Sequence, residues 1–147
     1  MNTIVNTDGI NYNQRDLEDH NTVAAVIRDV DGKVLVMKHH KFGFWTIPVG
    51  KAEAGQSDSD ALVAEVFEET DIEVIQFQEI ARKDFTYIRN GIAVNVVGIL
   101  YDIEEYEGIP LNKEPEKHSN LQFMSIEELR EKKDVSHLLE LYLSTRN

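Results

Sequence analysis

Cysteine is absent from the 147 residues of this chain, and only three prolines occur. Without cysteine, neither a disulfide framework nor a thiolate metal site can form. No apolar run approaches the roughly 20 residues that cross a bilayer. Residues 1–20 carry neither the basic nor the apolar region of a secretory signal. These absences favour a cytoplasmic protein that is not embedded in a membrane.

Positive charge is also scarce. The chain has 27 Asp and Glu against 15 Lys and Arg, which gives a net charge of −12. Such a field repels nucleic-acid backbones and anionic membrane surfaces, so we expect no nucleic-acid duplex and no membrane as partners. A small phosphorylated ligand is compatible with this charge, because a bound cation or a local basic patch reverses the potential at one site.

The strand pattern predicts a single α+β domain. A length of 147 residues fits one compact domain, and the hydrophobic fraction of 41% is ordinary for a globular protein. Asp31-Gly32 and Asn90-Gly91 are typical of hairpin turns, so segment 34–40 is expected to pair with segment 21–30. Alternating, β-branched stretches predict strands at 21–30, 34–40, 45–49, 72–88, 91–105 and 121–125.

Three helices are expected among these strands. The first runs to Thr70 after a cap at Ser57 or Ser59. A capping box at Ser125 predicts a short helix at 126–132. Apolar residues spaced i, i+3, i+4 and i+7 predict the last helix at about 135–144. The apolar face of that last helix packs either on the domain or on a second copy of the chain, so a homodimer is one expectation. The whole pattern favours a mixed sheet covered by helices.

Three glutamates share one face of the first helix. Glu65, Glu68 and Glu69 are spaced i, i+3 and i+4, opposite the apolar face. Two carboxylates about 4 Å apart repel by about 4 kcal/mol at an effective dielectric near 20. Between Lys51 and Arg82 the sequence has nine acids and no Lys or Arg to offset this. Mg²⁺ or Mn²⁺ would neutralise the patch; the alternative is an acidic surface screened by water.

Residues 45–56, together with residues 64–72 of the helix and its end, resemble the signature of the Nudix hydrolases. That signature is G-x5-E-x7-R-E-U-x-E-E-x-G-U, where U is bulky and apolar. The resemblance covers about residues 20–130, with 1–19 as an N-terminal extension and 131–147 as a C-terminal helical segment of one domain. The matching positions are Gly50, Glu65, Val66, Glu68, Glu69 and Ile72, and the flanking Trp45, Pro48, Glu53 and Gly55 also fit the family.

Three positions inside the signature depart from it. Gln56 replaces its first glutamate, Ala64 its arginine and Asp71 its glycine, and Val49 stands where a second glycine is frequent. In the family, that glutamate and arginine form an ion pair that orients the metal-binding helix. Losing both together leaves no unpaired buried charge. The loss of such support typically costs about 10–100-fold in affinity or activity.

The resemblance implies an α/β/α sandwich in which the signature helix and the C-terminal helices pack on a mixed sheet. It also implies Mg²⁺- or Mn²⁺-dependent hydrolysis of a nucleoside diphosphate linked to another moiety. The expected metal ligands are Glu65, Glu68, Glu69 and the carbonyl of Gly50. The alternatives are a catalytically weak or inactive nucleotide-binding or regulatory module on the same fold, and an acidic protein that binds a cation only structurally. The identity of the phosphorylated substrate stays open.

The general base has several candidates. Glu68 could serve, and so could Glu114 or Glu116 of the expected loop 105–120, with Glu116 preferred. Either loop carboxylate could instead complete the metal shell.

Substrate contacts are expected around the loop that precedes the helix. Lysines there could hold phosphate oxygens as point charges, and aromatic rings could stack on a base, with core packing as the alternative. His39 and His40 point to opposite faces of a strand, so only one can line the site. The candidate lysines are Lys38, Lys41 and Lys51, and the candidate rings are Trp45, Phe44 and Tyr87.

Overall fold

The computed structural model describes residues 3–6 and 9–146 of the chain. Its five-stranded sheet has the order β1-β6-β7-β2-β5, and its three-stranded sheet the order β4-β3-β8. The strands are β1 (Thr3–Asn6), β2 (His20–Val26), β3 (Val34–His39), β4 (Trp45–Thr46), β5 (Val49–Lys51), β6 (Glu73–Arg89), β7 (Ile92–Glu107) and β8 (His118–Met124). The helices are the 3₁₀ turn η1 (Arg15–Leu17), α1 (Asp58–Thr70), α2 (Ile126–Arg130) and α3 (His137–Ser144).

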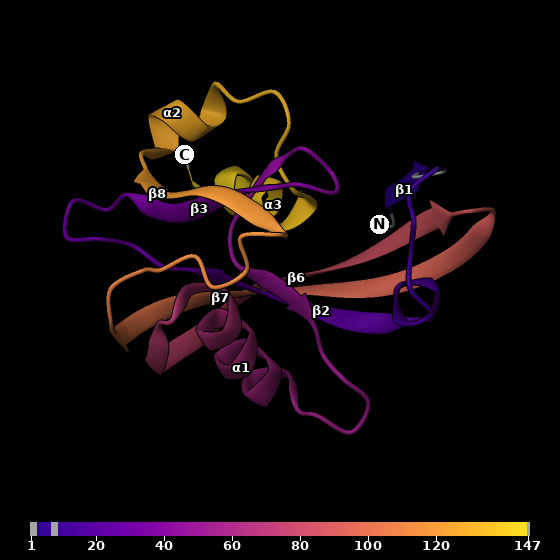
Figure 1. The fold of residues 1–147 in the computed structure, drawn as a ribbon, viewed down its shortest axis with the longest axis horizontal. Helices are drawn as coiled ribbons and strands as arrows, with labels where there is room; N and C mark the ends of the chain where they lie inside the picture. Colours follow the sequence, from indigo (N-terminus) through magenta and orange to yellow (C-terminus); the bar gives the residue numbers. More distant parts are fainter. Residues whose placement is uncertain (1–2, 7–8, 147) are drawn as a thin grey trace.

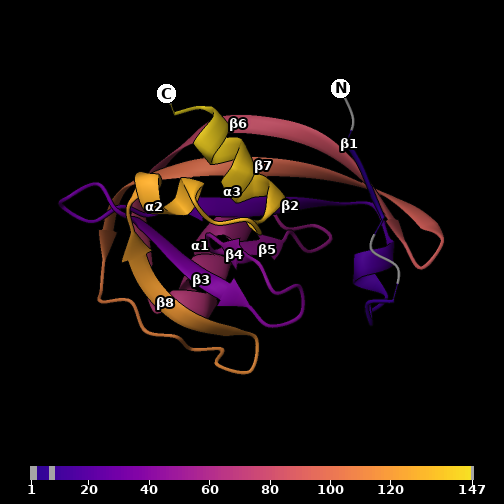
Figure 2. The same ribbon diagram turned by 90° about the horizontal axis from the view of Figure 1, so that it is seen from above.

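Helices lie on both sides of the strands. Figure 1 shows α1 below the large sheet, with α2 and α3 on the opposite side of the molecule near β3 and β8. Viewed from above, α3 crosses over β7 and β2 (Figure 2). The predicted α+β class is therefore confirmed, and the large sheet is mixed, since β2–β7 and β1–β6 are parallel while its other pairs are antiparallel. The strands form two sheets, however, where the sequence predicted one.

The predicted pairing of segments 21–30 and 34–40 is wrong. β2 pairs with β7 and β5, whereas β3 pairs with β4 and β8 in the other sheet. Between the two segments only an isolated bridge forms, Arg28 to Val34. The turn itself is present, with the Gly32 amide donating to the Asp29 carbonyl at 3.0 Å. A tight turn determines only where the chain reverses direction. Because β2 is buried on both sides, it pairs with other strands.

The expected strand 45–49 is divided between the sheets. β4 lies in the small sheet and β5 in the large one, with Pro48 between them. Proline has no amide to donate to a ladder, and here its carbonyl accepts from the Ala25 amide at 2.9 Å. This crossover brings Gly50, in β5, beside α1.

Two further boundaries differ from expectation. The predicted loop 105–120 is shorter, because β7 continues to Glu107 and β8 begins at His118. Within the N-terminal extension, β1 pairs in parallel with β6 and η1 forms a turn.

Two apolar clusters hold the layers together. One packs α1 residues such as Leu62 and Val66 against Ile99 and Ile103 of β7. The other packs α3 on β-strand residues, with Leu139 and Tyr142 buried. The apolar face of α3 therefore packs on its own domain, and a homodimer stays a prediction. No helix within residues 3–6 and 9–146 is long and apolar enough to cross a membrane.

Candidate metal and substrate site

The acidic helix α1 is fixed at both ends. Ser57 is its cap, with its Oγ accepting from the Asp60 amide at 3.1 Å. At the C-terminus Asp71 takes the left-handed conformation, with φ 63°, and its amide donates to the Phe67 carbonyl. Leu62 and Val66 face the sheet and are buried. The glutamates consequently lie along the remaining faces, and all three of them border one cavity.

Glu69 is the most buried of these acids, with 4% of its surface exposed. Its Oε1 accepts from the Val49 amide at 3.0 Å, and its Oε2 lies 3.3 Å from Nε2 of His118. Burial, followed by the charges of Glu65 and Glu114, raises the pKa of Glu69 well above its usual value. Burial also lowers the pKa of His118. Burial therefore disfavours the charged form of both groups.

Glu65 lies directly beneath Gly50. A Cβ atom on Gly50 would fall 2.1 Å from Cδ of Glu65, so only glycine leaves room for this carboxylate. Burial, and then the charges of Glu68 and Glu114, raise the pKa of Glu65 to about 7. Glu68 is exposed at the cavity edge.

The loop before β8 adds a carboxylate, and the first residue of β8 adds an imidazole. Ligand atoms of Glu69, Glu114 and His118 lie within 4.8 Å of one another. Glu116 also lines the cavity, but its backbone carbonyl is what bonds to Nδ1 of His40, at 3.2 Å. The structure thus brings Glu114 to the acidic cluster, while the preferred role of Glu116 stays a prediction.

His118 was missed by the sequence reasoning, which assigned it to a loop. It is 3% exposed, and its Nδ1 is buried with no hydrogen-bond partner among the described residues. The signal that could have found it is the segment E-P-E-K-H, which places His118 four residues after Glu114.

These residues fit a hard divalent cation. In the described part of the chain, no Lys or Arg forms a salt bridge with Glu65, Glu68 or Glu69. Carboxylate oxygens are the ligands that Mg²⁺ and Mn²⁺ prefer, and an imidazole suits Mn²⁺ better than Mg²⁺. Bound charge would offset the cost of keeping the buried carboxylates ionised.

A cavity of about 760 Å³ extends from this cluster. Cationic side chains flank it, and another part of its lining is aromatic and apolar. In that part the hydroxyl of Tyr87 lies 2.9 Å from Nδ1 of His137, and burial raises the pKa of Tyr87 to about 12. The cationic residues are Arg15, Lys41, Lys51, Arg89 and Lys117, and the aromatic and apolar part includes Phe85, Tyr87, Val96, His137 and Leu138.

Residues 18–143 match the family model described as NUDIX domain. The chain belongs to the Nudix hydrolase family. Over 66 residues this Nudix chain is 36% identical to the uncharacterized Nudix hydrolase YvcI of Bacillus subtilis (strain 168). That stretch covers 45% of this chain and 40% of the relative's length.

Solved structures share the Nudix fold with this chain. The MutT NUDIX hydrolase of Burkholderia pseudomallei superposes with a TM-score of 0.78 at 22% identity, covering 88% of this chain and 99% of that one. The MutT protein of Methanosarcina mazei Go1 gives 0.74 at 19% identity, covering 87% and 92%. At these identities the likeness concerns the fold.

The departures from the Nudix signature have local roles. Oε1 of Gln56 accepts from the Glu53 amide at 3.0 Å, which closes the loop before α1. Asp71 occupies the left-handed position where the signature has glycine, and Nζ of Lys113 lies 3.5 Å from its carboxylate. Ala64 is half-buried on α1.

The predicted substrate contacts divide into two groups. Lys41, Lys51, Phe44 and Tyr87 line the cavity. His39 and His40 both line it too, so the expectation that only one of them could do so is wrong, because β3 ends at His39 and His40 lies in the turn that follows. Lys38 is exposed on β3 and lies outside the cavity lining, as does Trp45. The backbone of Trp45 bonds to Asp134 and Ser136, and its ring packs against the core. The structure therefore does not bring Lys38 or Trp45 to the cavity.

Proposed function

We propose that this Nudix protein hydrolyses a nucleoside diphosphate linked to another moiety, with Mg²⁺ or Mn²⁺ as cofactor. The observation that carries the proposal is a group of carboxylates, with Glu69 buried, that lines a 760 Å³ cavity together with cations and aromatic rings. Each feature matches one part of such a substrate. The carboxylates match metal-bound phosphates, the cations match phosphate oxygens, and the rings match a base.

Glu65, Glu68, Glu69 and the Gly50 carbonyl would hold the metal, with Glu114 as a further ligand. The bound cation supplies charge neutralisation of the diphosphate and activation of the attacking water. Lys41 and Lys51 orient the phosphates as point charges. Glu68 is the most exposed of the three glutamates, which supports it as the base that accepts the proton of the water that attacks phosphorus.

His118 and the Val49 amide position Glu69. Both contact its carboxylate, one on each oxygen. Partners of this kind orient metal ligands and typically contribute about 10–100-fold to metal affinity or activity. This support compensates in part for the ion pair that Gln56 and Ala64 cannot form.

A substrate panel tests the proposal. Nucleoside triphosphates, sugar nucleotides, ADP-ribose and dinucleoside polyphosphates are incubated with Mg²⁺ or Mn²⁺, and products are separated by chromatography. We expect turnover of at least one class, lost with EDTA and reduced at least about 100-fold in Glu68→Gln, because the cation and a base each contribute about that much or more.

Glu73→Gln is the matched control, since it makes the same change at an exposed glutamate of β6 outside the cavity lining. It should keep full activity. Turnover that survives EDTA, or that is equal in the two variants, would contradict the proposed chemistry. If no compound is turned over while nucleotides still bind, the chain is a binding module on the Nudix fold.

A further inference from the structure

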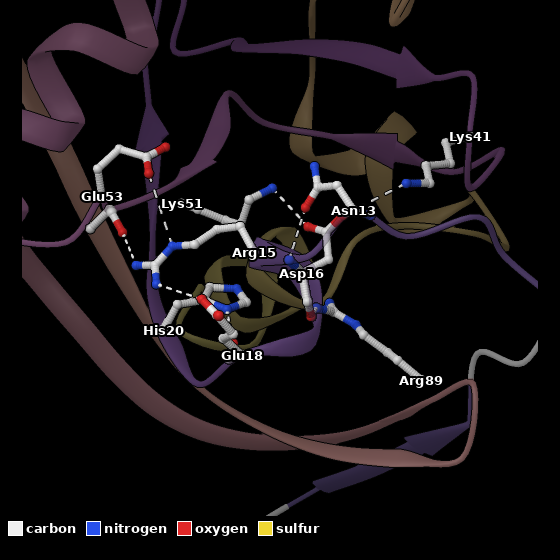
Figure 3. A network of polar contacts seen from close by, with 10 residues as sticks. Asn13, Arg15, Asp16, Glu18, His20, Lys41, Lys51, Glu53 and Arg89 are labelled. Atoms are coloured by element: carbon white, nitrogen blue, oxygen red, sulfur yellow. Dashed lines mark hydrogen bonds and ion pairs between the residues drawn. The ribbon is translucent and has the colours of Figure 1, made fainter.

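The N-terminal segment 9–19 folds across the cavity and contributes Tyr12, Asn13 and Asp16 to its lining. In Figure 3, the Asp16 side chain points between Lys51 and Lys41. Its Oδ1 accepts from Nζ of Lys51 at 2.8 Å, and its Oδ2 lies 3.8 Å from Nζ of Lys41. The Asp16 side chain is 14% exposed, so both contacts are partly shielded from water.

Asp16 is held in this position by its own segment. Its amide donates to Oδ1 of Asn13 at 2.9 Å, and the Asn13 amide donates back to the Asp16 carboxylate at 3.2 Å. The Asp16 carbonyl accepts from Arg89 at 2.7 Å, and the Arg89 guanidinium lies 5.1 Å from the Tyr12 ring centre. Arg15 anchors the same turn to the loop before α1, by donating to the Ala52 carbonyl at 2.7 Å.

Lys51 is the cation that connects this segment to the acidic cluster. It follows Gly50 in the chain, and its positive charge lowers the pKa of Glu65 against the stronger effect of burial. Lys51 and Glu65 line the same cavity, so Lys51 is a candidate contact for a phosphate group held beside Glu65. In the structure as described, the nearest anion to Lys51 is instead a carboxylate of the same chain.

We propose that Asp16 competes with substrate phosphates for Lys41 and Lys51. Carboxylate and phosphate oxygens accept the same charge-assisted hydrogen bonds from an ammonium group. An anion enters the site by taking these bonds from Asp16, and a metal-bound diphosphate displaces the carboxylate because it carries more charge and more oxygens. This inference deepens the proposed function and rests on it for the identity of the substrate.

Binding of inorganic pyrophosphate with Mg²⁺, measured by calorimetry, tests the competition without any turnover. We expect Asp16→Asn to bind pyrophosphate about three- to tenfold more tightly, since one charged competitor of modest strength is removed. Glu18→Gln removes the same charge from the same segment, but Glu18 contacts Arg15 rather than the lysines. It should change the affinity by less than twofold. In a Lys51→Gln background, the gain from Asp16→Asn should shrink.

Opposite results overturn the inference. Weaker binding by Asp16→Asn, in a variant whose thermal melt matches the native chain, would mean that Asp16 positions the lysines for the substrate. An equal effect of Asp16→Asn and Glu18→Gln would mean that only the change in net charge affects pyrophosphate binding. If either occurs while turnover still depends on Glu68, the competition fails and the proposed function stands. If Asp16→Asn tightens binding but no substrate is hydrolysed, the competition stands and the proposed function fails.

Discussion

Gly50 of β5 packs directly on the Glu65 side chain of α1, and this contact tests the site at the scale of single residues. In Gly50→Ala the new methyl would overlap the carboxylate of Glu65. That carboxylate is the far end of a flexible side chain, so it moves away while the fold stays intact. We expect a nearly unchanged melting temperature but a loss of about 10–100-fold in metal affinity, as for other misplaced ligands.

Gly55→Ala provides the contrast. Gly55 has φ +81° and no atom near its missing Cβ, so alanine there strains the backbone by about 1–2 kcal/mol without touching Glu65. This variant should lose stability and keep its metal affinity. A Gly50→Ala protein with native metal affinity would show that Glu65 is not a ligand.

The raised pKa of Glu65 predicts a pH dependence of stability in the metal-free protein. The group titrates near 4.5 when unfolded and at about 7 when folded. The folded state therefore holds this proton more tightly, and the stability that it contributes is complete below pH 4.5 and is lost as the pH rises to about 7. Glu65→Gln abolishes this loss.

Urea unfolding in EDTA measures that difference. The free energy of unfolding of Glu65→Gln, relative to the native chain, should rise between pH 4.5 and about 7 and become level above it. Comparison with the native chain at each pH removes the contribution of the histidines. A relative free energy that does not change with pH would contradict the assigned burial of Glu65, and the exposed Glu73→Gln variant should show no change.

Sequence reasoning succeeded in placing residues whose position follows from periodicity. Glu65, Glu68 and Glu69 share a helix face whatever the tertiary structure, and all three line the cavity. It missed His118 and Asp16, because each reaches the site from a segment without a regular period. The lysines were a mixed case. Lys41 and Lys51 line the cavity, whereas Lys38 does not. Its neighbour His39 on β3 lines the cavity, and successive side chains of a strand point to opposite faces.

At the scale of elements, the cap of α1 fixes where the glutamates lie along the helix. The sequence left Ser57 and Ser59 as alternatives, and the structure assigns the cap to Ser57. Ser57→Ala should therefore destabilise the protein by about 1 kcal/mol, the usual cost of losing a cap. Ser59→Ala, two residues later, should stay within about 0.5 kcal/mol of the native chain. Chemical denaturation of both variants checks this, and equal losses would contradict the assignment.

Element boundaries were predictable where turn and cap residues mark them. Ser57 and Ser125 cap the starts of α1 and α2, and Asn90-Gly91 forms the turn between β6 and β7. The division of segment 45–49 between two sheets was not predictable, because Pro48 shows only that a ladder is interrupted. Likewise β1 depends on β6, a partner about 80 residues away.

At the scale of the whole molecule, the sheet order could not be derived from local patterns. Alternation identifies a strand but not its neighbours, which explains why β2 and β3 were paired wrongly. The cavity gathers residues from Tyr12 to Leu138, so it exists only once both sheets and α3 are in place. Net charge predicted that polyanions are not partners, which stays a prediction, and it gave no information on the cations that line this cavity.

The central claim is that the glutamates of α1 hold a divalent cation, and titration of the free protein with Mn²⁺ tests it most directly. Electron paramagnetic resonance follows the free ion and requires no substrate. We predict saturable binding that weakens about 10–100-fold in Glu69→Gln and is unchanged in Glu73→Gln. Binding of equal strength in the native chain and Glu69→Gln would contradict the account, because the most buried carboxylate of the cluster would then have no part in holding the metal.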